Sequence, residues 1–258
     1  MKKITLSIMG LLLITSTLFA SGSSDGKTTW FNANKKADAA SYYTPTSRLS
    51  EVTYFSLSGE EITSESAEAT YSLSNYGNVI KRSISGDSSV YTLLDKIYDG
   101  YVLTPFEDEI AKLDKEYVGE ETVDGVNCDV FSVEVALDKN LFFFGSSNSG
   151  EIIGYDSDED DFDGSMTILI YINKESNEIV KQVATYTSLD TLPDLEIVQT
   201  TTYSSFDIDG ESVTLPSTVV TEGSYKEKAG SSSVYDITSF IATENYTSYQ
   251  YNKNYDHK

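Results

Sequence analysis

Histidine and cysteine, on which many catalytic and metal centres depend, occur only once each in this chain of 258 residues. The histidine is His257, so a histidine-based catalytic site and a histidine-containing zinc site are excluded. Cys128 has no partner for an internal disulfide. In a strand such a cysteine is usually a small buried apolar residue, and the neighbouring Asp129 disfavours a thiolate. We expect Cys128 to be inert, with an intermolecular disulfide or a reactive thiol as the alternative.

Positive charge is also scarce. The chain has 18 Lys and Arg against 41 Asp and Glu, a formal net charge of −23. Such a surface is poorly suited to nucleic acid or anionic lipid surfaces. The sequence contains no G-x-S-x-G, P-loop, H-E-x-x-H or C-x-x-C motif. Paired carboxylates could act as acid and base, but with this many acidic residues such pairs arise by chance. We therefore expect a protein that is not an enzyme and uses no cofactor.

Long apolar runs are absent beyond the N-terminus. Lys2 and Lys3 precede an apolar run over 4–14, and Ala20 offers a small residue for cleavage. This is the three-part layout of a secretory signal peptide. The run is too short to indicate a membrane span, although an uncleaved anchor is the alternative. We expect residues 1–20 to be removed and the chain to be exported, which in a Gram-negative cell means the periplasm.

The chain does contain many short segments rich in Val, Ile, Thr and Tyr, the residues that fit a pleated sheet. Dipeptides typical of tight turns, such as Asp124-Gly125 and Asp209-Gly210, separate them. The gaps are mostly short and most contain no helical segment, so we expect neighbouring strands to pair antiparallel in a meander. The predicted strands are 51–57, 67–74, 77–85, 88–94, 97–103, 116–123, 127–137, 166–173, 178–188, 195–208, 213–222 and 233–243.

Two segments have helical character. Thr104 begins a capping box with proline at the first helical position, and Phe106, Ile110 and Leu113 follow one turn apart on one face. This short helix would cover an open end of the sheet or act as a lid. Residues 32–41, rich in Ala and Lys, predict a second helix. They follow a Ser/Gly-rich start, so residues 21–47 could equally be a flexible arm.

Residues 116–135 form the most informative segment, a hairpin around Asp124-Gly125. Its pattern is Gly-Glu-x-x-x-x-Gly-x-x-Cys-x-Val-x-x-Val. This pattern resembles a segment of the periplasmic outer-membrane lipoprotein-carrier superfamily (LolA-like proteins and relatives such as RseB and LppX). Residues 97–103, 168–186 and 206–219 resemble other segments of that family in the same order. The resemblance covers roughly residues 48–222.

The resemblance implies a fold and a function. The fold would be mainly β: a single domain over 48–258, built as a curved antiparallel half-barrel with one or two short covering helices. The function would be that of a periplasmic carrier that binds lipid or lipoprotein acyl chains, with an envelope membrane protein as a further partner. The alternative is a non-catalytic envelope interaction or sensor module that uses the same fold. The family's basic residue for cargo acceptance could be Arg48 or Arg82.

The alternation of the strongest strands identifies candidate residues for the cavity of such a fold. Side chains two apart on a strand share a face. If these faces point inward, and the helix that carries Phe106, Ile110 and Leu113 closes over them as a lid, an apolar cavity lies between. The candidate lining residues are Phe131, Val133, Val135, Ile168, Ile170 and Ile172.

An insertion at about 138–165 interrupts the strands. Its first part contains Leu141, Phe142, Phe143 and Phe144, which would be buried in the core or form a mobile apolar lip. Its second part contains Asp156, Asp158 and Asp160, whose spacing could place oxygens around calcium. The EF-hand pattern fails here, because Asp161 stands where a glycine is needed and Thr167 where a glutamate is needed. A solvated acidic loop and a weak calcium site both remain open.

The composition is also biased toward tyrosine, which occurs 19 times. Its apolar body and polar tip suit half-exposed strands and wet cavity walls. Several tyrosines lie near the two ends of the chain, namely Tyr42, Tyr43, Tyr246, Tyr249, Tyr251 and Tyr255.

Overall fold

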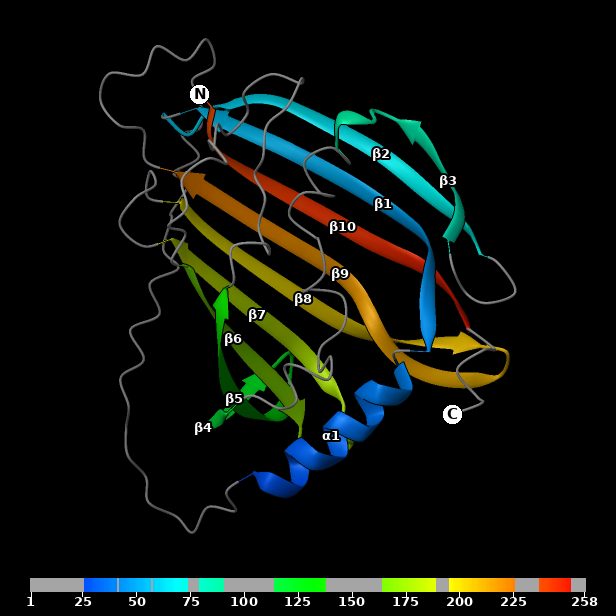
Figure 1. Ribbon diagram of the computed structural model, residues 1–258, viewed down its shortest axis with the longest axis vertical. Coiled ribbons are helices and arrows are strands. Elements are labelled where there is room, and N and C mark those ends of the chain that lie inside the picture. Colours follow the sequence, from blue (N-terminus) through cyan, green and yellow to red (C-terminus); the bar gives the residue numbers. More distant parts are fainter. Residues whose placement is uncertain are drawn as a thin grey trace.

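The computed structural model describes residues 26–40, 42–56, 58–73, 79–90, 114–137, 164–188, 195–225 and 237–251. These residues form one ten-stranded open sheet and one helix (Figure 1). The elements are α1 (Lys27–Ala40), β1 (Tyr43–Ser56), β2 (Glu61–Leu73), β3 (Val79–Gly86), β4 (Lys115–Val123), β5 (Val126–Leu137), β6 (Gly164–Asn173), β7 (Ile179–Ser188), β8 (Leu195–Ile208), β9 (Glu211–Tyr225) and β10 (Ile237–Tyr251). The predicted fold class, a mainly β antiparallel half-barrel, is confirmed.

The strand order is β3-β2-β1-β10-β9-β8-β7-β6-β5-β4, and every neighbouring pair is antiparallel. The first three strands and the last seven are each a meander, as the short gaps predicted. The chain passes from β3 at one edge to β4 at the other. The first and last strands in the sequence, β1 and β10, therefore pair with each other in the interior of the sheet.

Two-residue turns fix the register of two hairpins, β4–β5 and β8–β9. Asp124 and Gly125 have φ values of 49° and 84°, and Asp209 and Gly210 have values of 54° and 87°. Positive φ at both central residues is the turn that matches the right-handed twist of paired strands. The pairing Val123↔Val126 follows directly from the first of these turns. Both turns were predicted from their Asp-Gly sequences.

The prediction of a strand over 88–94 is wrong for the first residues of that segment. Residues 89 and 90 begin a helical turn, and the remainder of that segment lies outside the described residues. Asp87 explains the turn, since its Oδ1 accepts hydrogen bonds from the backbone N–H of Ser89 at 3.1 Å and from the Ser89 hydroxyl at 2.7 Å. A side chain that satisfies nearby backbone donors in this way favours a helix start over a strand.

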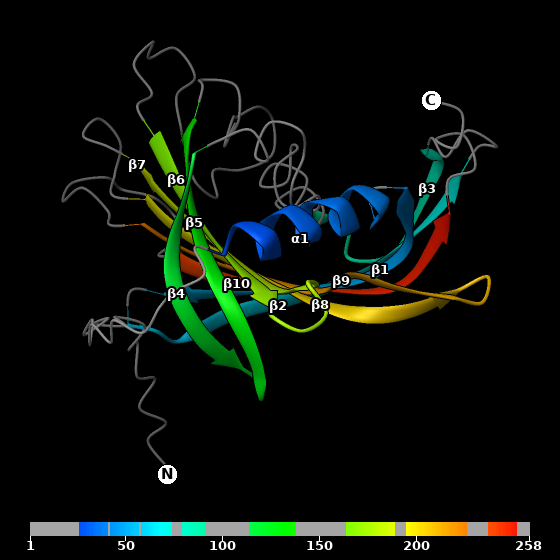
Figure 2. The ribbon, with the colours of Figure 1, turned by 90° about the horizontal axis from the view of Figure 1, so that it is seen from below.

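The sheet curves strongly, and α1 lies in its concavity (Figure 2). Every second residue of each strand points into this concave face. Buried side chains lie on it and also on the opposite face, where Cys128, Val130 and Tyr171 form a cluster. On β5 and β6 the concave face is apolar, with Phe131 opposite Ile170 and Val133 opposite Ile168. Among the described residues no helix has the length and apolar character needed to cross a membrane.

Candidate functional site

Helix α1 is held to the concave face through its N-terminal half. The ring of Trp30 lies 5.0 Å from the ring of Phe131 on β5, and Trp30 is 4% exposed. Gly26, at φ +61°, begins the helix so close to Phe131 that a Cβ there would lie 2.6 Å from its ring. The chain can therefore enter the helix at this point only with a residue that lacks a side chain.

Asp129 adds a polar anchor beside this contact. Its buried carboxylate accepts a hydrogen bond from the Thr29 hydroxyl at 2.7 Å and from the Tyr117 hydroxyl at 3.2 Å. Lys174 Nζ lies 3.8 Å away. Burial first, and then the charge of Asp129, raise the pKa of Tyr117 to about 12. Two donors and a nearby cation satisfy a carboxylate that would otherwise be costly to bury.

The predicted cavity residues lie together on this part of the face. Phe131, Val133, Ile168, Ile170 and Ile172 are all buried. Val135 pairs with Met166 in the same register. The structure has a pocket elsewhere, under the C-terminal half of α1, and none of these six is among the described residues that line it. Their role in binding cargo therefore stays a prediction.

A pocket of about 440 Å³ lies instead under the C-terminal half of α1. The helix contributes small side chains, Ala33, Ala37 and Ala40, which leave space beneath it. Strand β9 contributes Leu215 and Pro216 to the opposite wall. The pocket is thus a gap between a helix with short side chains and an apolar part of the sheet.

The sheet opens where the pocket lies. Strands β9 and β10 pair from Ser224↔Ser239 to Thr218↔Asn245. Beyond that pair β10 continues along β1 to Tyr251, while β9 runs back along β8 to Glu211. The prolines Pro45 and Pro216 each lie next to a register shift and away from one flanking strand. Proline cannot donate to a ladder, so it suits such positions.

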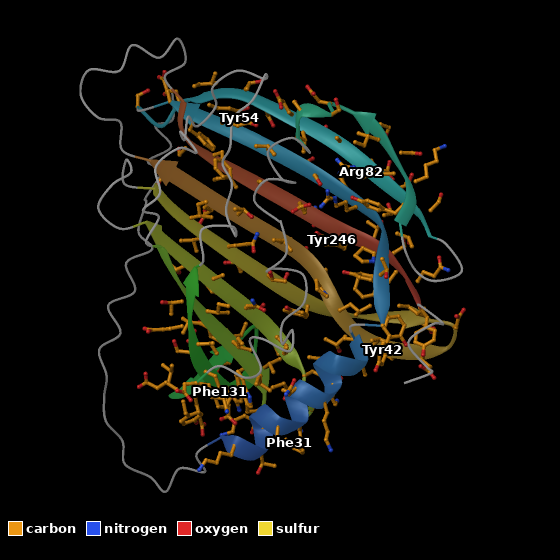
Figure 3. The ribbon with its side chains drawn as sticks, viewed as in Figure 1. Phe31, Tyr42, Tyr54, Arg82, Phe131 and Tyr246 are labelled. Atoms are coloured by element: carbon orange, nitrogen blue, oxygen red, sulfur yellow. The ribbon has the colours of Figure 1, made fainter. Side chains whose placement is uncertain are left out.

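Tyrosines line much of the pocket: Tyr42, Tyr43, Tyr203, Tyr249 and Tyr251. Tyr42 joins the end of α1 to β1 (Figure 3). The Tyr249 hydroxyl donates to the carbonyl of Pro216 at 2.6 Å and so bridges the opening between β9 and β10. The Tyr203 hydroxyl donates to Gln182 Oε1 at 3.3 Å. Burial raises the pKa of Tyr249 and of Tyr203 well above the ordinary value.

Charged groups stand at the edge of the pocket. Lys36 Nζ forms an ion pair with Glu178 Oε1 at 3.2 Å, and both side chains are well exposed. The Tyr43 hydroxyl donates to Glu211 Oε2 at 3.4 Å. Burial first, and then the carboxylate of Glu211, raise the pKa of Tyr43.

Polar groups occupy the middle of the concave face. Arg48 on β1 and Glu244 on β10 form a buried ion pair at 2.8 Å. Burial alone would lower the pKa of Arg48, but the Glu244 carboxylate raises it above the ordinary value. The guanidinium also lies 5.8 Å from the ring of Tyr71. Of the two arginines considered from the sequence, Arg48 is the buried one, and Arg82 on β3 is half-buried.

Several predicted features lie outside the described residues. These are the signal segment 1–20, the lid residues Phe106, Ile110 and Leu113, the lip Leu141–Phe144, and the calcium candidates Asp156, Asp158 and Asp160. Within the described ranges, no group of three or more His, Cys, Asp or Glu side chains could hold a metal ion. Cys128 is buried, and burial raises the pKa of its thiol.

Sequence reasoning missed the pocket under α1. The alanines of residues 32–41 indicated a helix, but not which of its faces would lie over the sheet. The tyrosines near both ends of the chain were the available signal, because four of them line this pocket, namely Tyr42, Tyr43, Tyr249 and Tyr251. Their convergence depends on the β1–β10 pairing, which no local pattern reveals.

Comparison with known proteins finds similarity only among solved structures. The sequence matches no protein-family model. It matches no curated protein. A DUF1329 family protein from Desulfovibrio piger aligns with 90% of this chain and 95% of its own, at 10% identity and a TM-score of 0.35. A domain from Vibrio parahaemolyticus, provisionally assigned as an outer membrane lipoprotein-sorting protein, aligns over the same shares at 10% identity and a TM-score of 0.37.

Proposed function

We propose that this protein is an exported, non-catalytic carrier that binds the acyl chains of lipids or lipoproteins in the pocket between α1 and the concave sheet. The observation that carries the proposal is the pocket itself, about 440 Å³ in volume, whose walls are mainly alanine, proline and tyrosine side chains with charged residues at the edge. Ligand sites typically have volumes of about 300–1,000 Å³ and mostly apolar walls. The sequence resemblance to lipoprotein carriers points to the same kind of cargo.

Burial of hydrocarbon would drive binding. Each methylene that leaves water contributes about 0.8 kcal/mol. The hydroxyls of Tyr203 and Tyr249 are bonded within the protein, so their rings can face cargo without exposing an unpaired donor. A chain placed under the helix would therefore meet mainly apolar surface.

The attachment of α1 suggests how cargo enters. Trp30 and Thr29 hold the N-terminal half of the helix through buried contacts. The C-terminal half is joined to the loop before β7 by the exposed pair Lys36–Glu178, and exposed pairs contribute only about 0–1 kcal/mol. In this proposal the C-terminal half shifts slightly from the sheet to admit cargo, within the limit set by Tyr42, which joins the end of α1 to β1.

The alternative, an envelope interaction or sensor module, has one observation in its favour. The end of the concave face over β5 is filled by the protein's own Trp30 and Phe131 rings. A protein that fills its cavity with its own side chains has no need of cargo. The pocket beneath Ala37 favours the carrier function, because it lies outside the filled region.

The test is the binding of an uncharged naphthylamine dye, whose fluorescence rises in apolar surroundings, to lipid-stripped protein. Ala37→Trp fills the pocket from the helix and should weaken binding on the order of tenfold or more. Phe31→Trp is the matched control, because Phe31 lies on the same helix but is 58% exposed. If the unaltered protein binds no dye, or if both variants bind equally well, the carrier proposal is wrong. If the dye result supports the carrier, native mass spectrometry of protein from the host envelope would identify its cargo.

A further inference from the structure

The pocket has an aromatic corner at its edge. Tyr43 and Tyr251 are paired across β1 and β10, and their ring centroids lie 5.2 Å apart with the ring planes tilted by 57°. Both residues line the pocket. The face of each tyrosine ring carries partial negative charge and its edge partial positive charge.

Among the described residues, the charges that line the pocket sum to a net negative charge. Lys36, Glu178 and Glu211 are the charged residues among the described ones that line the pocket. Lys36 and Glu178 neutralise one another as an ion pair, which leaves the carboxylate of Glu211. The hydrogen bond from the Tyr43 hydroxyl holds Glu211 beside the corner. The negative charges of Glu211 and Asp209 both act on Tyr43, in addition to its burial, and raise its pKa.

We propose that the ligand of this pocket carries an ammonium group at its polar end, and that the group lies at the corner of Tyr43 and Tyr251 with Glu211 as its counter-charge. This inference rests on the proposed function, since the ligand's hydrocarbon lies in the pocket under α1. A cation is attracted to the faces of aromatic rings. A carboxylate or sulfate would instead meet the negative ring faces and the charge of Glu211. The pocket therefore selects ammonium-bearing amphiphiles over anionic ones of equal chain length.

Competition for the naphthylamine dye tests this selectivity in the full-length protein. The competitors are dodecyl amphiphiles below their micelle concentrations, with a trimethylammonium, an uncharged maltoside or a sulfate head group. Cation–π contacts predict that the trimethylammonium compound displaces the dye at about fivefold to thirtyfold lower concentration than the uncharged one. The sulfate compound should be the weakest of the three.

Charge variants separate the site from the overall negative charge of the protein. Glu211→Gln should reduce the ammonium preference by about fivefold. Glu222→Gln makes the same change in net charge at an exposed position of β9 outside the pocket, and should leave the preference intact. Tyr251→Leu keeps the apolar surface but removes one ring, and should also reduce the preference.

Each outcome has a distinct meaning. Dye binding with equal displacement by all three compounds, or with stronger displacement by the sulfate, overturns the ammonium site and leaves the carrier intact. An equal loss of preference in Glu211→Gln and Glu222→Gln overturns it too, because the attraction would then be general. A protein that binds no dye overturns the carrier function and the ammonium site together.

Discussion

Replacing Glu244 by leucine tests how much the buried ion pair holds the middle of the sheet together. The Arg48 and Glu244 side chains are 2.8 Å apart and only 7% and 0% exposed. Removing the carboxylate leaves a guanidinium where water cannot hydrate it fully. Breaking a buried pair in this way typically costs about 3–5 kcal/mol. We therefore expect Glu244→Leu to lower the free energy of unfolding by that amount.

The double variant Arg48→Met/Glu244→Leu separates the pair from the charge left behind. Both charges are then absent, and apolar residues of similar size fill the space. Such replacements are often neutral or stabilising, so the double variant should recover most of the stability that Glu244→Leu loses. The exposed pair Lys36–Glu178 is the control, and losing it should cost no more than about 1 kcal/mol.

Urea unfolding followed by tryptophan fluorescence measures these differences. Trp30 is the single tryptophan of the chain and is buried against Phe131, so its emission reports the folded state. Urea adds no ionic strength, so it leaves the ion pair unscreened. A loss below about 1 kcal/mol in Glu244→Leu would refute the reasoning. So would a double variant as unstable as the single one.

Three further predictions concern packing, pH and the attachment of α1. Gly223→Ala should destabilise the sheet by about 1–3 kcal/mol in thermal unfolding, because a Cβ there would lie 2.2 Å from the buried ring of Phe240; an unchanged melting temperature would contradict this. The pKa of Tyr117 is about 12 in the fold against an ordinary 10.0, so its stabilising effect is complete below pH 10 and is lost as the pH rises to about 12. Tyr117→Phe should flatten the stability profile between those values, and an unaltered profile would contradict the assignment. Asp129→Ala should remove the acceptor of Thr29 and speed amide hydrogen exchange in α1 while β8 and β9 stay protected; equal exchange in α1 would show that Trp30 alone holds the helix.

The strands and turns of this protein follow from local sequence patterns. Asp-Gly at 124–125 predicts a two-residue turn because these residues tolerate positive φ, and the register of β4 and β5 follows from it. The alternation of Phe131 and Val133 predicts a strand with one buried face, and both side chains are buried. The opposite face of β5 is buried in part as well, at Cys128 and Val130. Such patterns act over a few residues, so the sequence alone shows them.

Strand ends were harder to predict where charge or proline interrupts the pattern. The last strand was expected to stop at residue 243, before Glu244, yet β10 runs to Tyr251. Glu244 is tolerated inside the sheet because the side chain of Arg48, 196 residues earlier, forms an ion pair with it from the neighbouring strand. Pro45 likewise sits within β1, where a register shift accommodates it. Each exception depends on a partner distant in the sequence.

The sequence by itself determined three properties of this protein. The chain is mainly β with antiparallel hairpins, it has a strong negative charge, and it has no histidine-based centre. The tertiary structure alone decided which residues meet. It placed α1 over the concave face, separated β9 from β10 beyond Thr218 and Asn245, and brought Tyr43 beside Tyr251. The physical reason is that a pocket is made by contacts between segments far apart in the chain, whereas hydrophobic periodicity and turn chemistry act only between near neighbours.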